Sequence, residues 1–221
     1  MKTICYISKS FPHKSETFIV NQIVAAIKRD YHVLILTNNF LSINSSSQEV
    51  LFSKYSLVDK VRKIDFNISK NKVLKLFQLL ILHAKYFKYV IKNVEMSART
   101  RFIKLPFKIR FYEKFINVDT FHIQFGNAGF DIILMKKIGL IKSKFIITFH
   151  GYDAHWNGEV DFVRKTKLYK DVFKYCEIIT CNSLYLKNKL VLLGCPIEKI
   201  SIIPMGIDMD LFTPIYKEKK V

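Results

Sequence analysis

The chain has 221 residues, enough for one sizeable α/β domain and short for two, and half of them are hydrophobic, which excludes a disordered chain. Its 36 Lys and Arg against 18 Asp and Glu give a formal net charge of +18, which favours a polyanionic partner such as phospholipid, lipid-linked phosphate or nucleic acid. The four cysteines form no C-x-x-C pair and have no histidine at zinc spacing, so the sequence indicates neither a metal site nor a disulfide framework.

The first forty residues predict a β-α-β unit. Short apolar runs at Thr3–Ile7 and His32–Leu36 are typical of buried strands, and Glu16–Arg29 repeats apolar residues at helical spacing. Ser15 is the expected N-cap of this helix, and the charge of Glu16 suits the positive end of the helix dipole. Strands joined through a helix pair in parallel with a right-handed crossover, so the unit predicts a parallel sheet.

The next part of the chain is less regular and forms a basic helical insertion. Residues 38–70 predict a long loop with one strand near Val61–Phe66. A long helix is expected at Asn71–Asn93, and a second at Arg99–Lys114, bent at Pro106. Lysines interrupt the apolar stretch of the first helix, which makes a membrane span unfavourable.

A local excess of positive charge marks these two helices. Residues 51–115 hold sixteen Lys or Arg and four Asp or Glu. We expect this patch to dock on an anionic membrane surface; the alternative is a Lys-rich composition whose lysines are merely solvated. The candidate membrane contacts are Lys72, Lys75, Lys85, Lys88, Lys92, Arg99, Arg101, Lys104 and Lys108. Because a strand-like run directly follows Met1, with no signal-peptide pattern, we expect a cytoplasmic protein, peripheral on the inner face of the cell membrane.

Regular alternation of strands and helices resumes after residue 115. Predicted strands at Thr120–Phe125, Phe145–Phe149, Glu177–Cys181 and Ile200–Pro204 alternate with predicted helices at Ala128–Ile138, Val160–Tyr175 and Leu184–Leu193. Asn182 and Ser183 precede the last helix as capping residues, and Gly194 ends it. The predicted fold is an α/β, Rossmann-like doubly wound parallel sheet in a single domain over residues 1–210, with residues 211–221 as the start of a linker or tail.

Polar residues gather where the predicted strands end. Ligands of open parallel sheets bind beyond the carboxyl ends of the strands, because helix N-termini and free loop backbones point there. The sharpest candidate is His150, which directly follows an apolar strand and, with Asp153, is suited to bind hydroxyls or shuttle a proton. The alternative is a turn in which Asp153 caps the next segment and His150 is structural. The candidate substrate-binding residues are Ser15, Glu16, Gly126, Asn127, Gly151, Tyr152, Asp153, Asn182 and Ser183.

The glycine patterns indicate what the site does not bind. Gly126 and Gly129 lie at the spacing of a phosphate cradle, but a tight turn accounts for a lone G-x-x-G better. No G-x-G-x-x-G and no P-loop pattern follows the first strand, so a dinucleotide or P-loop site is not expected. No metal or cofactor is expected either.

Four segments resemble motifs of one family, in the family's order. They are Phe11–Ile19 followed by Asn21–Ile23, then Phe121–Gly126, Thr148–Asp153 and Asn182–Pro214. They resemble the S-E-T-F-I signature, the H-x-H-F-G strand, the T-F-H-G-Y-D motif and the stretch that closes the N-terminal domain of bacterial retaining glycosyltransferases of family four, which assemble exopolysaccharide and lipopolysaccharide. The segment around residues 40–115 lies outside the resemblance.

The resemblance implies a GT-B fold of two Rossmann-like domains facing across a cleft. This chain would be the N-terminal, acceptor-binding domain, with the C-terminal donor-binding domain absent. The complete enzyme would move a hexose from a nucleotide sugar to a lipid-linked or polysaccharide acceptor, and His150 would be the catalytic position that contacts the transferred sugar or the acceptor hydroxyl. The isolated chain is expected to have little or no activity, because nothing in it would stabilise the leaving phosphates.

Two departures from the family pattern leave alternatives open. The first loop has His13 and Lys14 where relatives have glycines, and Gln124 replaces the second histidine of the strand motif. A noncatalytic acceptor-binding or membrane-recruiting subunit, working with a separate donor-binding subunit, would give the same sequence. Nucleic acid is not an expected partner, because only the charge suggests it and no recognition-helix, RRM or OB signature is present.

Overall fold

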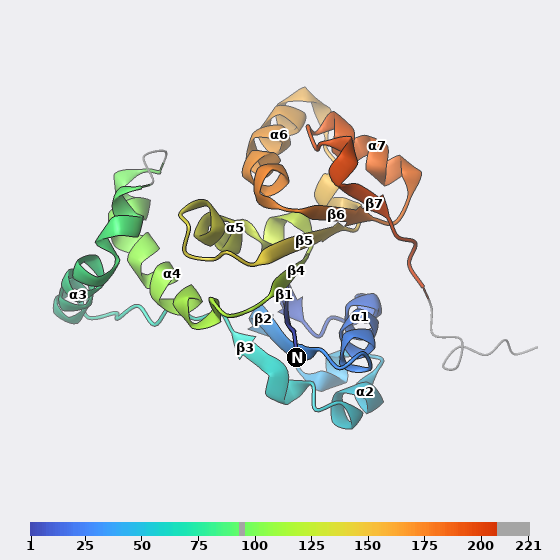
Figure 1. The fold of residues 1–221 in the computed structure, drawn as a ribbon, viewed down its shortest axis with the longest axis horizontal. Coiled ribbons are helices and arrows are strands. Elements are labelled where there is room, and N and C mark those ends of the chain that lie inside the picture. Colours follow the sequence, from blue (N-terminus) through green and yellow to red (C-terminus); the bar gives the residue numbers. More distant parts are fainter. Residues whose placement is uncertain (93–95, 207–221) are drawn as a thin grey trace, which may run out of the picture.

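One sheet of seven parallel strands organises the chain (Figure 1). The structure is a computed structural model that describes residues 1–92 and 96–206, and the strand order is β3-β2-β1-β4-β5-β6-β7. The strands are β1 (Thr3–Phe11), β2 (His32–Phe40), β3 (Val61–Lys63), β4 (Thr120–Gln124), β5 (Lys144–Phe149), β6 (Ile178–Cys181) and β7 (Ile200–Ile202). All six neighbouring pairs are parallel. The chain winds outward in both directions from β1 and β4, which confirms the doubly wound, Rossmann-like sheet expected from the sequence.

Helices pack on both faces of this sheet (Figure 1). They are α1 (Thr17–Ile27), α2 (Glu49–Lys54), α3 (Lys72–Ile91), α4 (Leu105–Tyr112), α5 (Phe130–Lys137), α6 (Gly158–Tyr175) and α7 (Leu184–Leu192). Alternate residues of a strand point to opposite faces, and β1 shows the division. Tyr6 packs in an apolar cluster with α1 and α2, whereas Cys5 and Ile7 pack in the larger cluster that holds residues of α3 to α7.

One helix cap predicted from the sequence is present in the structure, and another is not. Ser183 caps α7 as expected, with its hydroxyl accepting from the Leu186 N–H at 3.3 Å. The expected N-cap role of Ser15 is wrong, because α1 begins at Thr17 with Glu16 as the capping residue. Ser15 lies in the preceding turn, where its hydroxyl is 2.9 Å from Nδ1 of His13.

Two strands in the first third of the chain are longer than the sequence predicted. Strands β1 and β2 extend four residues beyond the predicted ends, and Ser8 pairs with Thr37 in the extension. Ladder hydrogen bonds use the backbone, so polar side chains do not end a strand. The expected loop contains a short helix, α2, which packs by burying Phe52. The strand expected near Val61–Phe66 is present as β3, shortened to three residues.

The basic insertion also differs in detail from the expectation. The second basic helix is not one helix bent at Pro106: a short π-helix, Thr100–Lys104, precedes α4, and Pro106 lies in the first turn of α4. Proline is favourable there, because an N–H group in the first turn has no acceptor within the helix and proline lacks that group. The first basic helix is confirmed as α3, and its expected end at Asn93 lies outside the described residues.

Some expectations fall on parts of the chain that the structure does not describe. The predicted domain end at residue 210 and the tail 211–221 lie outside the described residues. Within the described ranges, no helix combines the length and apolarity needed to cross a bilayer. Among the same residues, no group of three or more His, Cys, Asp and Glu side chains is placed to hold a metal ion.

Candidate functional site

His150 lies at the carboxyl edge of the sheet, directly after β5, and is held between two aromatic rings. Its imidazole centroid is 4.4 Å from the ring of Phe18 in α1 and 4.6 Å from the ring of Phe125 after β4. These two neighbours come from two different segments of the chain. The packing leaves the histidine half-buried and fixes the plane of its ring.

A hydrogen-bonded chain of amides determines which nitrogen of this imidazole carries the proton. Nε2 of His150 lies 3.0 Å from Oε1 of Gln124, and Nε2 of Gln124 donates to Oε1 of Gln22 at 2.8 Å. Because the Gln124 amide nitrogen is engaged with Gln22, its oxygen accepts from His150 Nε2–H. Burial lowers the pKa of His150 to about 4. The ring is therefore neutral at pH 7 and keeps Nδ1 as an acceptor, with no hydrogen-bond partner among the described residues.

Asp153 follows His150 in the same loop and joins the loops that follow β4 and β5. Its carboxylate accepts from the N–H groups of Gly126 at 2.9 Å, His150 at 3.1 Å and Gly151 at 3.1 Å. The side chain is buried; burial raises its pKa, and the three donors act against that rise. Gly151 has φ +119°, a conformation that L side chains rarely adopt. Asp153 thus positions the backbone that carries His150.

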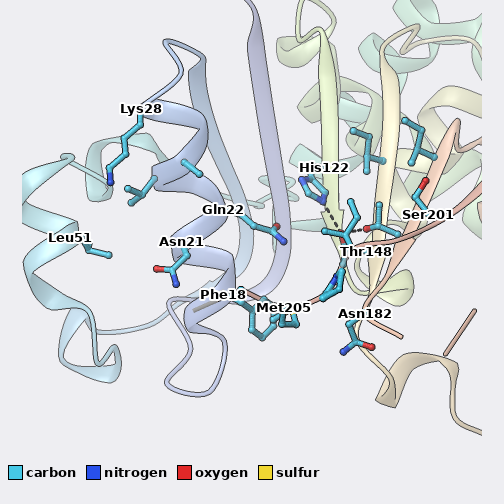
Figure 2. Close-up of a pocket in the computed structure, with 18 residues that line it drawn as sticks. Phe18, Asn21, Gln22, Lys28, Leu51, His122, Thr148, Asn182, Ser201 and Met205 are labelled. Atoms are coloured by element: carbon cyan, nitrogen blue, oxygen red, sulfur yellow. Dashed lines mark hydrogen bonds between the residues drawn. The ribbon is translucent and has the colours of Figure 1, made fainter. Parts of the chain in front are cut away.

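Two pockets lie near His150, although the histidine itself lines neither of them. The first has a volume of about 650 Å³ and lies between α1 and the strands β4 to β7. Its polar lining residues are Asn21, Gln22, Lys28, His122, Thr148, Thr180, Asn182 and Ser201. Figure 2 shows Gln22 reaching from α1 toward the strands that carry His122 and Thr148. Phe18, which contacts His150, also lines this pocket.

The floor of the first pocket is a second hydrogen-bonded chain. Nε2 of His122 lies 2.8 Å from Oγ1 of Thr148, which is 2.7 Å from Oγ1 of Thr180 (Figure 2). Burial and, to a smaller extent, the nearby His150 lower the pKa of His122 to about 4. Sequence reasoning did not place His122, Thr148 or Gln22 in the site. The alternation within β4 was the available signal, because His122 and Gln124 are two residues apart and share a face.

The second pocket, of about 350 Å³, brings together four of the predicted substrate-binding residues. Gly151, Tyr152, Asn182 and Ser183 line it, and Asn182 lines the first pocket as well. Tyr152 is almost fully exposed at the rim. The remaining lining residues are Ala154, His155, Tyr185, Leu186 and Lys189. Aromatic, amide and hydroxyl side chains in one pocket suit the apolar and hydroxyl faces of a sugar.

The other predicted substrate-binding residues, Asp153 among them, line neither pocket. Ser15 and Glu16 lie before α1, where Glu16 Oε1 is 4.0 Å from Nδ1 of His13 and burial raises the Glu16 pKa. Gly126 is buried, with its N–H on Asp153, and Asn127 follows it in a short 3₁₀ turn. A Cβ at Gly126 would lie 2.4 Å from the Phe149 ring, so close packing requires this glycine.

The predicted membrane contacts gather on α3 and the segment that leads to α4. Lys85 pairs with Glu113 at 2.8 Å and stays exposed. Lys108 differs, because its ammonium forms an ion pair with Asp131 and only 19% of its side chain is exposed. Lys108 is therefore not part of the exposed basic surface.

Comparison with known sequences identifies relatives of the chain. A profile of Glycosyltransferase Family 4 matches residues 15–211. The chain is 28% identical over 218 residues to WcaL of Escherichia coli (strain K12), named as a colanic acid biosynthesis glycosyltransferase, covering 92% of this chain and 50% of WcaL. It is 27% identical over 214 residues to AmsK of Erwinia amylovora, an amylovoran biosynthesis glycosyltransferase, covering 95% of this chain and 52% of AmsK. The chain thus spans about half the length of these curated relatives.

Solved structures show the same fold. HepE of Anabaena, crystallised with UDP and glucose, superposes with a TM-score of 0.61 at 12% identity, over 96% of this chain and 46% of HepE. A glycosyltransferase of Rickettsia africae ESF-5 superposes with a TM-score of 0.53 at 16% identity, over 99% of this chain and 47% of its own. These likenesses confirm the expected Rossmann-like half of a GT-B architecture.

Proposed function

Because the chain belongs to Glycosyltransferase Family 4, we propose that it is the acceptor-side half of an enzyme that transfers a hexose in cell-surface polysaccharide biosynthesis. The donor would be a nucleotide sugar, and the acceptor a lipid-linked or polysaccharide glycan. The names of WcaL and AmsK support the process, and the sugar nucleotide bound by HepE supports the class of donor.

The placement of His150 carries this proposal. Its ring is clamped by Phe18 and Phe125 at the carboxyl edge, with Nε2–H committed to Gln124 and Nδ1 left as an acceptor. A neutral imidazole of this kind accepts a hydrogen bond from a sugar hydroxyl and orients it. With a pKa of about 4 it is a poor proton donor at pH 7, so we assign it orientation and hydrogen bonding rather than general acid catalysis.

The donor half would supply the positive charge that the pockets of this half lack. Lys28 and Lys189 are the Lys and Arg residues that line the two pockets within the described chain, and they line different pockets. A departing nucleoside diphosphate needs preorganised cations or N–H donors. We therefore propose that a donor-binding domain completes the site, and that this chain alone transfers little or no sugar.

A noncatalytic role is the second candidate. An acceptor-binding or membrane-recruiting subunit, with a separate donor-binding polypeptide, needs the same cleft and the same basic insertion. Its distinguishing property is a stable association with that polypeptide. Co-purification of a donor-binding partner with the tagged chain from its own cells would favour this candidate.

We place the protein in the cytoplasm, on the inner face of the cell membrane. The excess of twelve positive charges over residues 51–115 supports this position, and Lys72, Lys88 and Lys92 of that segment are exposed in the structure. Each Lys or Arg near an anionic surface contributes about 1 kcal/mol, so several exposed cations suffice for reversible binding.

The test is transfer of labelled hexose to a bacterial lipid extract. The purified chain is assayed with radiolabelled UDP-glucose and UDP-galactose, beside a chimera in which it replaces the aligned half of AmsK. We expect transfer by the chimera and none above background by the chain alone. Turnover by the chain alone would contradict the division into halves, and an inactive but folded chimera that still binds the sugar nucleotide would contradict the catalytic role.

A further inference from the structure

Helix α3 is the outermost element of the molecule and packs on one side only. Its main contacts are with α4 and the π-helix before α4, and Figure 1 shows α4 lying between α3 and the sheet. The side that faces α4 buries Leu82, Tyr86 and Val90. The rest of the helix surface faces away from the sheet.

The outward side of α3 is apolar, which is unusual for a helix at the edge of a domain. Val73, Phe77, Leu80, Phe87 and Ile91 follow one another at spacings of four, three, seven and four residues, which places them in one stripe along the helix. Between 45% and 75% of each of these residues is exposed. An exposed apolar stripe of this length marks a surface that meets an apolar partner.

A neighbouring segment widens this stripe. Phe102 of the π-helix is held beside α3 by a 2.7 Å contact between its carbonyl oxygen and Nε2 of His83. Its ring lies 6.0 Å from the His83 ring and is partly exposed, as is the side chain of Ile103. The apolar surface therefore spans two adjacent elements.

The charges around the stripe identify the partner. Residues 72–92 contain five lysines and no acidic residue. Lys85, Lys88 and Lys92 follow the stripe at one flank, and exposed Arg99 and Lys104 lie in the segment that leads to α4. A second copy of the chain would bring two such cationic helices together, which like-charge repulsion disfavours. An anionic bilayer offers an apolar interior and a negative headgroup layer at once.

We propose that α3 is an interfacial helix that lies in the plane of an anionic bilayer, with Phe77, Leu80 and Phe87 among the acyl chains and its lysines at the lipid phosphates. This deepens the proposed membrane location, on which it depends. Surface attraction by lysines alone needs no insertion and disappears at high salt. Insertion adds a hydrophobic contribution that salt does not screen.

The experiment compares two matched triple variants of the full chain. The first, Phe77→Ser with Leu80→Ser and Phe87→Ser, removes the stripe; the second, Val160→Ser with Leu168→Ser and Leu192→Ser, removes apolar residues of at least 45% exposure from α6 and α7. Flotation uses vesicles of phosphatidylcholine alone and of phosphatidylcholine with phosphatidylglycerol. At about 0.5 M NaCl we expect the first variant to lose roughly tenfold or more in vesicle partitioning and the second to change less than about twofold.

Tryptophan fluorescence locates the inserted residues directly. In a Trp156→Phe background, which removes the single native tryptophan, Phe77→Trp should shift to the blue and be quenched by brominated lipid, whereas Leu192→Trp should not. Binding to anionic vesicles that both triple variants retain equally would overturn insertion while leaving the membrane location intact. A dimer in sedimentation equilibrium that only the first variant abolishes would also overturn it, with a second copy as the occupant.

Discussion

Nε2 of His150 lies 3.0 Å from the amide oxygen of Gln124, although the two residues are 26 positions apart in the chain. Gln124 is fully buried, and its amide nitrogen donates to Oε1 of Gln22 in α1. The bond thus couples the first helix, the fourth strand and the loop after the fifth. It also determines which nitrogen of His150 carries the proton.

Gln124→Glu should raise the pKa of His150. A carboxylate beside Nε2 favours the imidazolium, so we expect the pKa to move from about 4 to roughly 6 or above. Long-range ¹H–¹⁵N spectra of the histidine rings over a pH series report this value. Gln22→Glu, one amide further away, is the control and should produce a smaller rise. An unchanged His150 titration in Gln124→Glu would show that this hydrogen bond does not form in solution.

Asp153→Ala should destabilise the fold more than an ordinary surface carboxylate variant does. It leaves three N–H groups without their acceptor, at a cost of about 2–4 kcal/mol in the free energy of unfolding. Asp65→Ala is a matched control, because the Asp65 side chain is exposed and accepts one N–H, from Asn67 at 2.8 Å. Urea denaturation measures both. Equal losses in the two variants would contradict the role assigned to Asp153.

Gly126→Ala should cost about 2–3 kcal/mol of stability, because the added Cβ would lie 2.4 Å from the Phe149 ring in a packed core. At Gly206 a Cβ meets no atom within 4 Å, so Gly206→Ala should change stability by less than about 0.5 kcal/mol. Thermal unfolding distinguishes the two. A neutral Gly126→Ala would show that the ring has room to move.

Stability should fall as the pH drops from about 6.5 toward 4, and His122, together with His150, contributes to this fall. Its pKa is lowered to about 4 in the folded chain and is about 6.5 when unfolded, so the unfolded state takes up the proton first. The contribution of neutral His122 to the free energy of unfolding is complete above pH 6.5 and is lost as the pH approaches 4. His122→Asn should flatten the dependence in urea titrations by roughly 1–3 kcal/mol, since each pH unit is worth about 1.4 kcal/mol. A curve for His122→Asn identical to that of the unmodified chain would contradict the assignment.

Lys88→Gln together with Lys92→Gln should lower the affinity for anionic vesicles by roughly tenfold or more at low salt. Lys142→Gln with Lys170→Gln removes the same charge from exposed positions outside α3 and serves as the control. Vesicle sedimentation measures both pairs. A similar loss in the two pairs would show that net charge, and not the position on α3, governs binding.

The sheet and its topology could be predicted from the sequence because each depends on local pattern. Apolar runs marked the strands, and Ser183 marked the start of α7. Helix α2 was missed because its six residues are too few to show a helical period. The ends of β1 and β2 were missed because backbone pairing continued through polar residues.

The candidate site was predictable only in part. The position of His150 after an apolar strand placed it at the carboxyl edge, since the common direction of the parallel strands determines that edge. Its contacts with Phe18 and Gln124 depend on how α1 packs across the sheet, which no local pattern encodes. The sequence predicted that α3 is a helix and that it is basic. The exposure of its apolar stripe depends on which side of α3 is covered by α4, and only the fold shows that.

We expect the His150 imidazole to hydrogen-bond the transferred sugar or the acceptor hydroxyl from the acceptor side of the cleft. The most direct measurement is the rate of labelled hexose transfer by the chimera with the aligned half of AmsK, comparing the unmodified chain with His150→Ala at equal folded concentration. We expect His150→Ala to lower kcat by roughly a hundredfold or more, with binding of the sugar nucleotide little changed. Equal rates in the two proteins would contradict it.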